Sequence, residues 1–196
     1  MRYSDQHIAS TFYAYKNTTI GPGLEAVVRF HSVKRWHMID TTRQQTLAEH
    51  SANVALLVYH ISSQCPHMYF GPSGHAATYA LLHDLPEVYT GDIPSHTKGF
   101  IDGIAELEVA VTPDYMVPKS TVGVTSHGLN ALTKLCDLAD GIRFIRLHGV
   151  GATAKHAEAG LAGKFAAAIT RAKDDWPAEV SDYVSKQVML YAYEYS

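Results

Sequence analysis

Apolar residues recur every three or four positions through most of this chain, and this helical period constrains the fold more than any other feature. The clearest segment begins at Thr46-Leu-Ala-Glu49, a capping-box pattern in which the Thr hydroxyl accepts from a backbone N–H of the first turn. Apolar residues then follow at helical spacing as far as Cys65-Pro66, where the proline ends the helix. Alternating patterns that would indicate strands are few and short.

Further helices are predicted along the rest of the chain. Their approximate ranges are 23–35, 73–88, 101–111, 130–147, 154–173 and 177–193, with a loop at 91–99. In the first of them, Leu24, Val27 and Val28 would lie on one face. Because 196 residues suit one domain with a sizeable core, we expect residues 1–196 to form a single all-α helical bundle.

The composition narrows the range of partners. The formal net charge is −3, which gives no overall positive field for nucleic acid or an anionic membrane. No signal peptide and no apolar run of membrane-spanning length is apparent. The two cysteines have no CxxC spacing and do not suggest a disulfide framework, so a cytoplasmic location is expected.

Polar residues interrupt the apolar faces of several predicted helices. The dipeptide His83-Asp84 alone carries little weight, because 12 His and 11 Asp in 196 residues supply about 0.7 such pairs by chance. His50, however, lies on the apolar stripe of its helix, and Asp137 lies in the middle of another apolar helix. Asp140 shares the face of Asp137 and is a rival for the same role.

Three helices would thus direct two imidazoles and two carboxylates into one core. Buried charge is costly unless it is paired or binds a metal ion. Two neutral His and two ionised Asp satisfy a divalent cation and leave coordination positions for water or substrate. The sequence therefore predicts a metal site formed by His50, His83, Asp84 and either Asp137 or Asp140.

The order of these residues resembles that of the HD-domain metal-dependent phosphohydrolases, and the HD-domain bundle is the fold that this resemblance implies. The chain is similar to the YfbR-like 5′-deoxynucleotidases and the phage dATP triphosphohydrolases within that family. Arg35-Trp36 precedes TLAEHS (46–51), LLHDLPEVYTGDIPSHTK (81–98) and LTKLCDLADGI (132–142). The resemblance implies that His50, His83, Asp84 and Asp137 bind the catalytic metal, and the alignment of LTKLCD favours Asp137 over Asp140.

The resemblance also implies roles for five other residues. Glu87 and Asp92 would share the activation of water and the protonation of the departing 5′ oxygen, in a division that the sequence leaves open. Arg35 and Lys98 would hold phosphate. Trp36 would pack against the sugar and disfavour a 2′-hydroxyl.

Two reactions at the α-phosphate are compatible with this family. The first converts dATP to deoxyadenosine and triphosphate, and the alternative releases phosphate from deoxynucleoside 5′-monophosphates. The short interval between His83-Asp84 and Asp137 resembles that of the phage enzymes and favours dATP. A metal-binding module without turnover is disfavoured by Glu87 and Asp92, and a phosphodiesterase of the wider HD group is disfavoured by the Arg-Trp and GDIP elements.

The cofactor and the partners follow from the same resemblance. His and Asp ligands suit Co, Zn, Mn or Fe, and a second, Mg-like ion would ride on the phosphates. The expected partners are a deoxynucleotide substrate and further copies of the chain in a homo-oligomer, with no nucleic acid and no membrane. A phage-encoded chain would act in the host cytoplasm.

Overall fold

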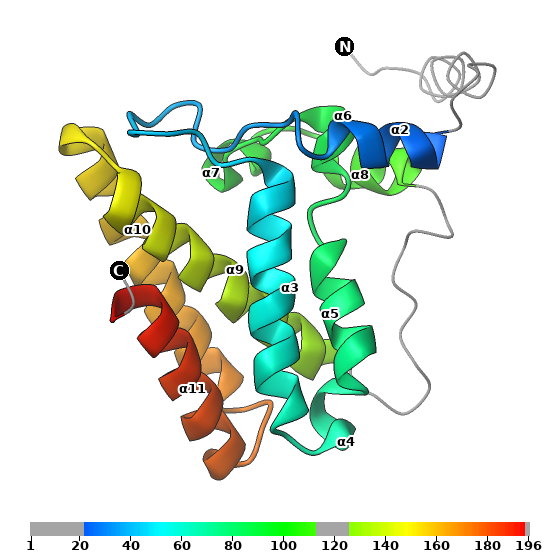
Figure 1. The fold of residues 1–196 in the computed structure, drawn as a ribbon, viewed down its shortest axis with the longest axis vertical. Helices are drawn as coiled ribbons and strands as arrows, with labels where there is room; N and C mark the ends of the chain where they lie inside the picture. Colours follow the sequence, from blue (N-terminus) through cyan, green and yellow to red (C-terminus); the bar gives the residue numbers. More distant parts are fainter. Residues whose placement is uncertain (1–21, 113–125, 195–196) are drawn as a thin grey trace.

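The computed structural model describes residues 22–112 and 126–194, and all regular secondary structure in these two ranges is helical (Figure 1). Pairing between extended segments is limited there to two isolated bridges, Lys34 with Thr46 and Thr41 with Gly149. None of the described helices is both long and apolar enough to cross a bilayer. The all-α prediction is confirmed, while the extent of the single domain stays a prediction.

The long helices form the body of the molecule. They are α3 (Leu47–Ser63), α5 (Ser73–Leu81), α9 (Ser126–His148), α10 (Gly151–Ala172) and α11 (Ala178–Tyr193). Helix α3 packs against α5 and α9, and α9 packs in turn against α10 and α11. The apolar stripes predicted for α3 and α9 face each other in the main core, which includes Val54, Val58, Ile61, Leu132, Leu135 and Ile142.

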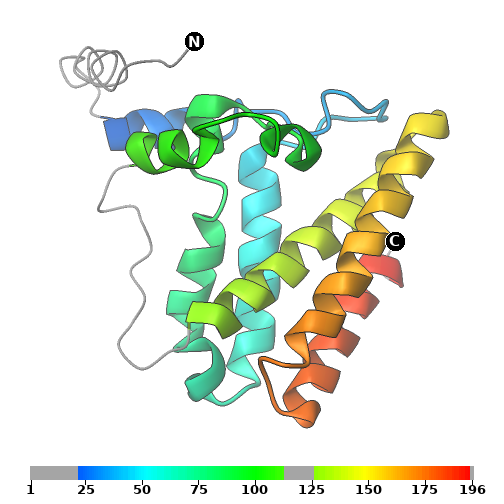
Figure 2. The ribbon, with the colours of Figure 1, turned by 180° about the vertical axis from the view of Figure 1, so that it is seen from behind.

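Short helices cover the ends of this body. Those at the N-terminal end of α3 are α2 (Pro22–Arg29), α6 (Glu87–Thr90), α7 (Ser95–Lys98) and α8 (Ile104–Val111), and α4 (His67–Phe70) lies at the opposite end (Figures 1 and 2). Since α5 runs back towards the N-terminal end of α3, the residues after α5 meet the first turn of α3. The predicted loop 91–99 contains α7.

The start of α3 follows the predicted cap only in part. Thr46 has an extended backbone, and its Oγ1 accepts from the Glu49 backbone N–H at 3.0 Å. The carboxylate of Glu49 does not close the box on Thr46 but accepts two hydrogen bonds from the Arg43 guanidinium, at 2.6 and 2.8 Å. The cap at Thr46 fixes the start of α3 at Leu47, three residues before His50.

Helix α2 is shorter than predicted and turns a different face inwards. It ends at Arg29, and its fully buried residue is Ala26, whereas Leu24, Val27 and Val28 are 59%, 59% and 52% exposed. The face that Leu24, Val27 and Val28 share is thus turned mostly to solvent. The reason lies in the small area that α2 covers, since Ala26 packs into a minor buried cluster with Leu47, Leu85 and Val88.

The predicted helix 73–88 is wrong beyond Leu81, where α5 ends. Residues 82–86 form turns instead, and α6 begins at Glu87. Pro86 has no N–H to donate to the carbonyl of Leu82, and its ring disfavours helical backbone at Leu85. His83 and Asp84 therefore lie in a turn beyond the helix.

Candidate metal centre and active site

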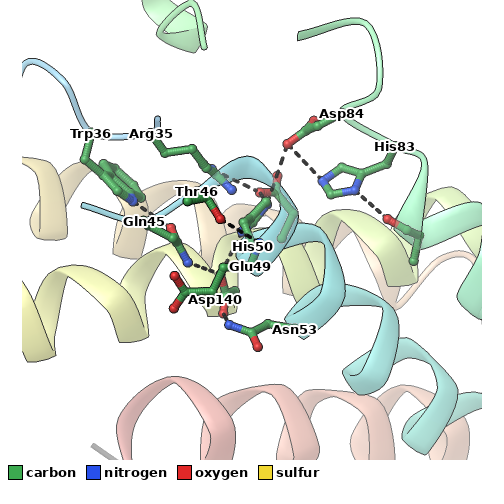
Figure 3. A network of polar contacts seen from close by, with 12 residues as sticks. Arg35, Trp36, Gln45, Thr46, Glu49, His50, Asn53, His83, Asp84 and Asp140 are labelled. Atoms are coloured by element: carbon green, nitrogen blue, oxygen red, sulfur yellow. Dashed lines mark hydrogen bonds and ion pairs between the residues drawn. The ribbon is translucent and has the colours of Figure 1, made fainter. Parts of the chain in front are cut away.

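His50 lies in the first turn of α3 with a fully buried side chain. Its Nδ1 lies 2.7 Å from Oδ2 of Asp140 on α9 (Figure 3). Burial raises the pKa of Asp140, but the hydrogen bond from His50 and those from Tyr191 and Gln45 outweigh it and lower that pKa overall. An ionised carboxylate only accepts, so Nδ1 carries the proton and the lone pair of Nε2 is left for a metal ion.

His83 and Asp84 reach the same place from the turn after α5. His83 Nδ1 lies 2.6 Å from the Ala80 carbonyl oxygen, and only a protonated Nδ1 can donate to it. The opposite atom, Nε2, lies 3.2 Å from Oδ2 of Asp84, which is also 3.6 Å from Nε2 of His50. Because His83 and Asp84 lie beyond the end of α5, both side chains can face His50. Two consecutive residues on one helix point in different directions and would face it less readily.

Asp137 completes the group from α9. One carboxylate oxygen, Oδ1, lies 3.2 Å from Nε2 of His50, and the other accepts from Lys134 Nζ at 2.6 Å. Ligand atoms of His50, His83, Asp84 and Asp137 all lie within 4.8 Å of one another. The structure therefore brings together the four residues that the sequence predicted as ligands.

The chemistry of these four residues fits a divalent cation. The Nε2 atoms of His50 and His83 are buried and have no hydrogen-bond partner among the described residues. Burial raises the pKa of Asp84 and of Asp137, but His83 for the first and His50 and Lys134 for the second outweigh it, so both pKa values are lowered. Two ionised carboxylates and the Nε2 atoms of two imidazoles form a donor set typical of Zn²⁺ and related ions.

Arg35 lies at the edge of this group. Its NH2 atom lies 3.8 Å from Oδ1 of Asp137, and its side chain is 12% exposed. Burial lowers the pKa of Arg35, but Asp84 and Asp137 outweigh it and raise that pKa, so the guanidinium is charged. Its Nε and NH1 atoms are buried without a partner in the described ranges. Such donors next to a metal group suit the oxygens of a phosphate.

Trp36 follows with an unusual backbone. Its φ is 64°, in the left-handed region that costs a bulky residue free energy. The indole ring stacks on Phe144 with 6.2 Å between centroids, and its Nε1 donates to Gln45 Oε1 at 2.8 Å. The backbone N–H of Trp36 donates to Asp92 Oδ2 at 3.3 Å. These contacts hold Trp36 and Asp92, both predicted site residues, beside Arg35.

Glu87 opens α6 with a buried carboxyl group. Its Oε1 accepts from Lys98 Nζ at 3.0 Å, and its Oε2 is buried without a hydrogen-bond partner among the described residues. Burial and the charge of Asp84 raise the pKa of Glu87 to about 8, although Lys98 lowers it. A carboxyl group that titrates near neutral pH suits proton transfer.

Lys98, predicted to hold phosphate, is engaged by two carboxylates. Its Nζ lies 3.0 Å from Glu87 and 2.8 Å from Oε1 of Glu108 on α8. A phosphate would have to replace one of these partners. The phosphate role of Lys98 stays a prediction.

Several residues around the site were not assigned by sequence reasoning. Asp140 was considered only as a rival ligand, although it binds the far side of His50. Lys134 and Glu108 form ion pairs with Asp137 and Lys98. The spacing of Lys134 and Asp137, three residues apart on a helix, was the one signal that could have shown such a pair. Gln45 gave no signal, because its partners are distant in the sequence.

Known proteins resemble this chain in sequence. A family model described as 5′-deoxynucleotidase YfbR-like matches residues 24–111. The dATP triphosphohydrolase of Salmonella phage PMBT28 is 30% identical over 151 residues, which cover 71% of this chain and 74% of that relative. The 5′-deoxynucleotidase YfbR of Salmonella arizonae is 31% identical over 80 residues, or 40% of each chain.

A solved structure resembles the chain over most of its length. It is the cyanophage S-2L HD phosphohydrolase DatZ bound to dA and one catalytic Zn²⁺ ion, with a TM-score of 0.70 and 26% identity. The match covers 87% of this chain and 95% of that protein. The sequence relatives and this structure confirm the predicted resemblance to HD-domain phosphohydrolases.

The two carboxylates of α9 should affect metal binding to different degrees. We expect Asp137→Ala to abolish tight Zn²⁺ binding, because it removes a ligand oxygen. Asp140→Asn should weaken binding by about 10- to 100-fold, because the ligand His50 loses the charge that orients it. Competition with a chromophoric chelator measures both affinities, and Asp175→Asn, at an exposed carboxylate, is the control. Loss of binding in the Asp140 variant alone would assign the ligand to Asp140.

The carboxyl group of Glu87 should make stability fall with pH in metal-free protein. Its pKa is about 8 in the folded state, above the ordinary value of 4.5, so the unfolded state binds fewer protons between these pH values. Stability from this group is therefore lost as pH rises from 5 to 8. The glutamine of Glu87→Gln does not titrate. The free energy of unfolding of this variant, relative to that of the wild type, should therefore increase as pH rises from 5 to 8. Denaturant titrations in the presence of a chelator would measure both free energies. Glu106→Gln, at an exposed carboxylate of the neighbouring helix, is the control, and an equal trend in both variants would refute the assignment.

Proposed function

Because the chain belongs to the HD-domain phosphohydrolase family that includes phage dATP triphosphohydrolases and YfbR-like 5′-deoxynucleotidases, we propose that it hydrolyses dATP at the α-phosphate to deoxyadenosine and triphosphate. The observation that carries this proposal is the group of four ligand residues, in which two imidazole nitrogens make no hydrogen bond within the described ranges, beside donors of Arg35 that also lack one there. The relative at 30% identity and DatZ, which binds dA and Zn²⁺, support dATP as the substrate.

His50, His83, Asp84 and Asp137 would hold the divalent cation in this proposal. When bound, the cation polarises a phosphate oxygen and lowers the pKa of a bound water. Zn²⁺ is the ion in the related structure, and Co, Mn or Fe also suit the ligand types. A second, Mg-like ion would be held by the phosphates themselves.

The surrounding side chains would bind and orient the nucleotide. Arg35 would donate Nε and NH1 to two oxygens of the phosphate chain. Lys98 would exchange one of its two carboxylate partners for a phosphate oxygen. The stacked ring of Trp36 would lie against the sugar and leave no room for a 2′-hydroxyl, so that deoxynucleotides are preferred.

Glu87 and Asp92 would move the protons. Glu87 suits the role of the base that takes a proton from the attacking water, because its Oε2 has no hydrogen-bond partner in the described part of the chain and its pKa lies near 8. Asp92 would relay a proton to the 5′ oxygen of the leaving deoxyadenosine, so that the proton lost by the attacking water and the proton gained by the leaving group balance. The backbone N–H of Trp36 donates to Asp92, and this contact supports a role for Asp92 next to the proposed sugar contact.

The alternative substrate is a deoxynucleoside 5′-monophosphate, with phosphate as the product. The match of residues 24–111 to the YfbR-like model favours it. The same ligands and proton carriers would serve, since the bond broken is the same. We infer that the reaction takes place in the cytoplasm, and the homo-oligomer stays a prediction.

A product assay distinguishes these substrates. We expect purified protein with Zn²⁺, Co²⁺ or Mn²⁺ to release triphosphate from dATP, seen by phosphorus NMR, to turn over ATP far more slowly, and to leave dAMP unchanged. Asp84→Asn should be inactive, because a ligand is lost. Phosphate released from dAMP, with dATP untouched, would replace the proposal by the alternative. No turnover of any of these nucleotides would refute both.

A further inference from the structure

Gln45 is a buried amide that lies between two parts of the site. It is 1% exposed and directly precedes the cap of α3. Its Oε1 accepts from Nε1 of Trp36 at 2.8 Å, and its Nε2 donates to Oδ2 of Asp140 at 2.8 Å (Figure 3). The same Asp140 oxygen lies 2.7 Å from Nδ1 of His50. A continuous chain of hydrogen bonds thus leads from the indole ring to a metal ligand.

The chemistry of the partners fixes the orientation of the Gln45 amide. An indole N–H only donates, so it must meet the amide oxygen, and an ionised carboxylate only accepts, so it must meet the amide nitrogen. Turning the amide over would break both bonds and leave Trp36 Nε1 and the two amide atoms of Gln45 without these partners. Gln45 therefore has one orientation, and this orientation requires both Trp36 and Asp140 to stay in place.

The backbone of Gln45 holds the same segment. Its carbonyl accepts from the Arg35 N–H at 2.9 Å, beside the bridge between Lys34 and Thr46. A tryptophan at a φ of 64° keeps that conformation only where surrounding contacts compensate for the strain. Two of these contacts come from Gln45, one through its backbone and one through its side chain.

We propose that Gln45 is a positioning residue that couples the metal ligand His50 to Trp36. The orientation of the His50 ring and the placement of the indole then depend on each other, because both rest on one amide. The roles of His50 in metal binding and of Trp36 at the sugar rest on the proposed function. The coupling itself is a property of the hydrogen-bond chain and does not require turnover.

Two variants of Gln45 and one matched variant test the coupling. Gln45→Leu removes both side-chain bonds. Gln45→Glu keeps an acceptor for Trp36 but cannot donate to ionised Asp140, and it answers the question if the Leu variant fails to fold. Tyr191→Phe is the control, because the Tyr191 hydroxyl donates to the other oxygen of Asp140, at 2.8 Å, and does not contact Gln45 in the described structure.

The first measurement follows the indole N–H resonances in nitrogen-15 NMR spectra during Zn²⁺ titration. We expect Zn²⁺ to shift the Trp36 resonance in the wild type and in Tyr191→Phe, and to shift it much less in both Gln45 variants. Trp176 is the internal reference, because its buried Nε1 has no hydrogen-bond partner in the described ranges. The Zn²⁺ affinity of both Gln45 variants should fall by about tenfold. A Trp36 shift and a Zn²⁺ affinity equal to those of the wild type in either folded Gln45 variant would overturn the proposal.

The second measurement compares kcat/KM for dATP and ATP. The preference for dATP should fall about tenfold in Gln45→Leu, because the indole is no longer held, and should stay unchanged in Tyr191→Phe. An equal loss of preference in both variants would overturn the link to Trp36. If the wild type turns over neither nucleotide while the NMR coupling is present, the proposed function fails and the positioning role of Gln45 stands.

Discussion

The hydrogen bond between His50 and Asp140 is the contact on which the rest of the site depends. It joins the first turn of α3 to α9 at 2.7 Å and decides which nitrogen of His50 faces the other ligands. Asn53, Gln45 and Tyr191 also donate to the same carboxylate, so its charge is stabilised by hydrogen bonds from four residues. Because Asp140 is held from four sides, the ligand that it orients has little freedom to turn.

The group on the other side of His50 makes fewer hydrogen bonds among the described residues. Asp84 and Asp137 approach two imidazoles whose Nε2 atoms are buried without hydrogen bonds in the described ranges. Burial of His83 lowers its pKa, but Asp84 outweighs this and raises it to about 9, so a proton would occupy the site in the absence of a cation. A cation competes with that proton for the same lone pair. Asp140, whose oxygens accept several hydrogen bonds, therefore supports the site. The Nε2 atoms of the two imidazoles, which make no hydrogen bond in the described ranges, form its binding side.

Much of the fold and most of the ligand set could be predicted, because both depend on local patterns. The cap at Thr46 and the long apolar stripes of α3 and α9 define the two helices that carry His50 and Asp137. The turn at His83 departs from the prediction, since the helical period of the sequence continues past Leu81 whereas Pro86 prevents the helix from continuing there. The contact between Gln45 and Asp140 could not be predicted, because the two residues are 95 positions apart in the sequence. A periodic pattern does not indicate which buried polar groups contact each other across a core.

We propose that two histidines and two aspartates bind one metal ion. Asp140 would support His50 without contacting that ion. A crystal structure of the Zn²⁺-loaded protein with anomalous diffraction at the zinc edge tests this most directly. We expect one strong peak at about 2.0–2.2 Å from His50 Nε2, His83 Nε2 and the nearest oxygens of Asp84 and Asp137. A peak coordinated by Asp140, or one outside this group, would contradict it.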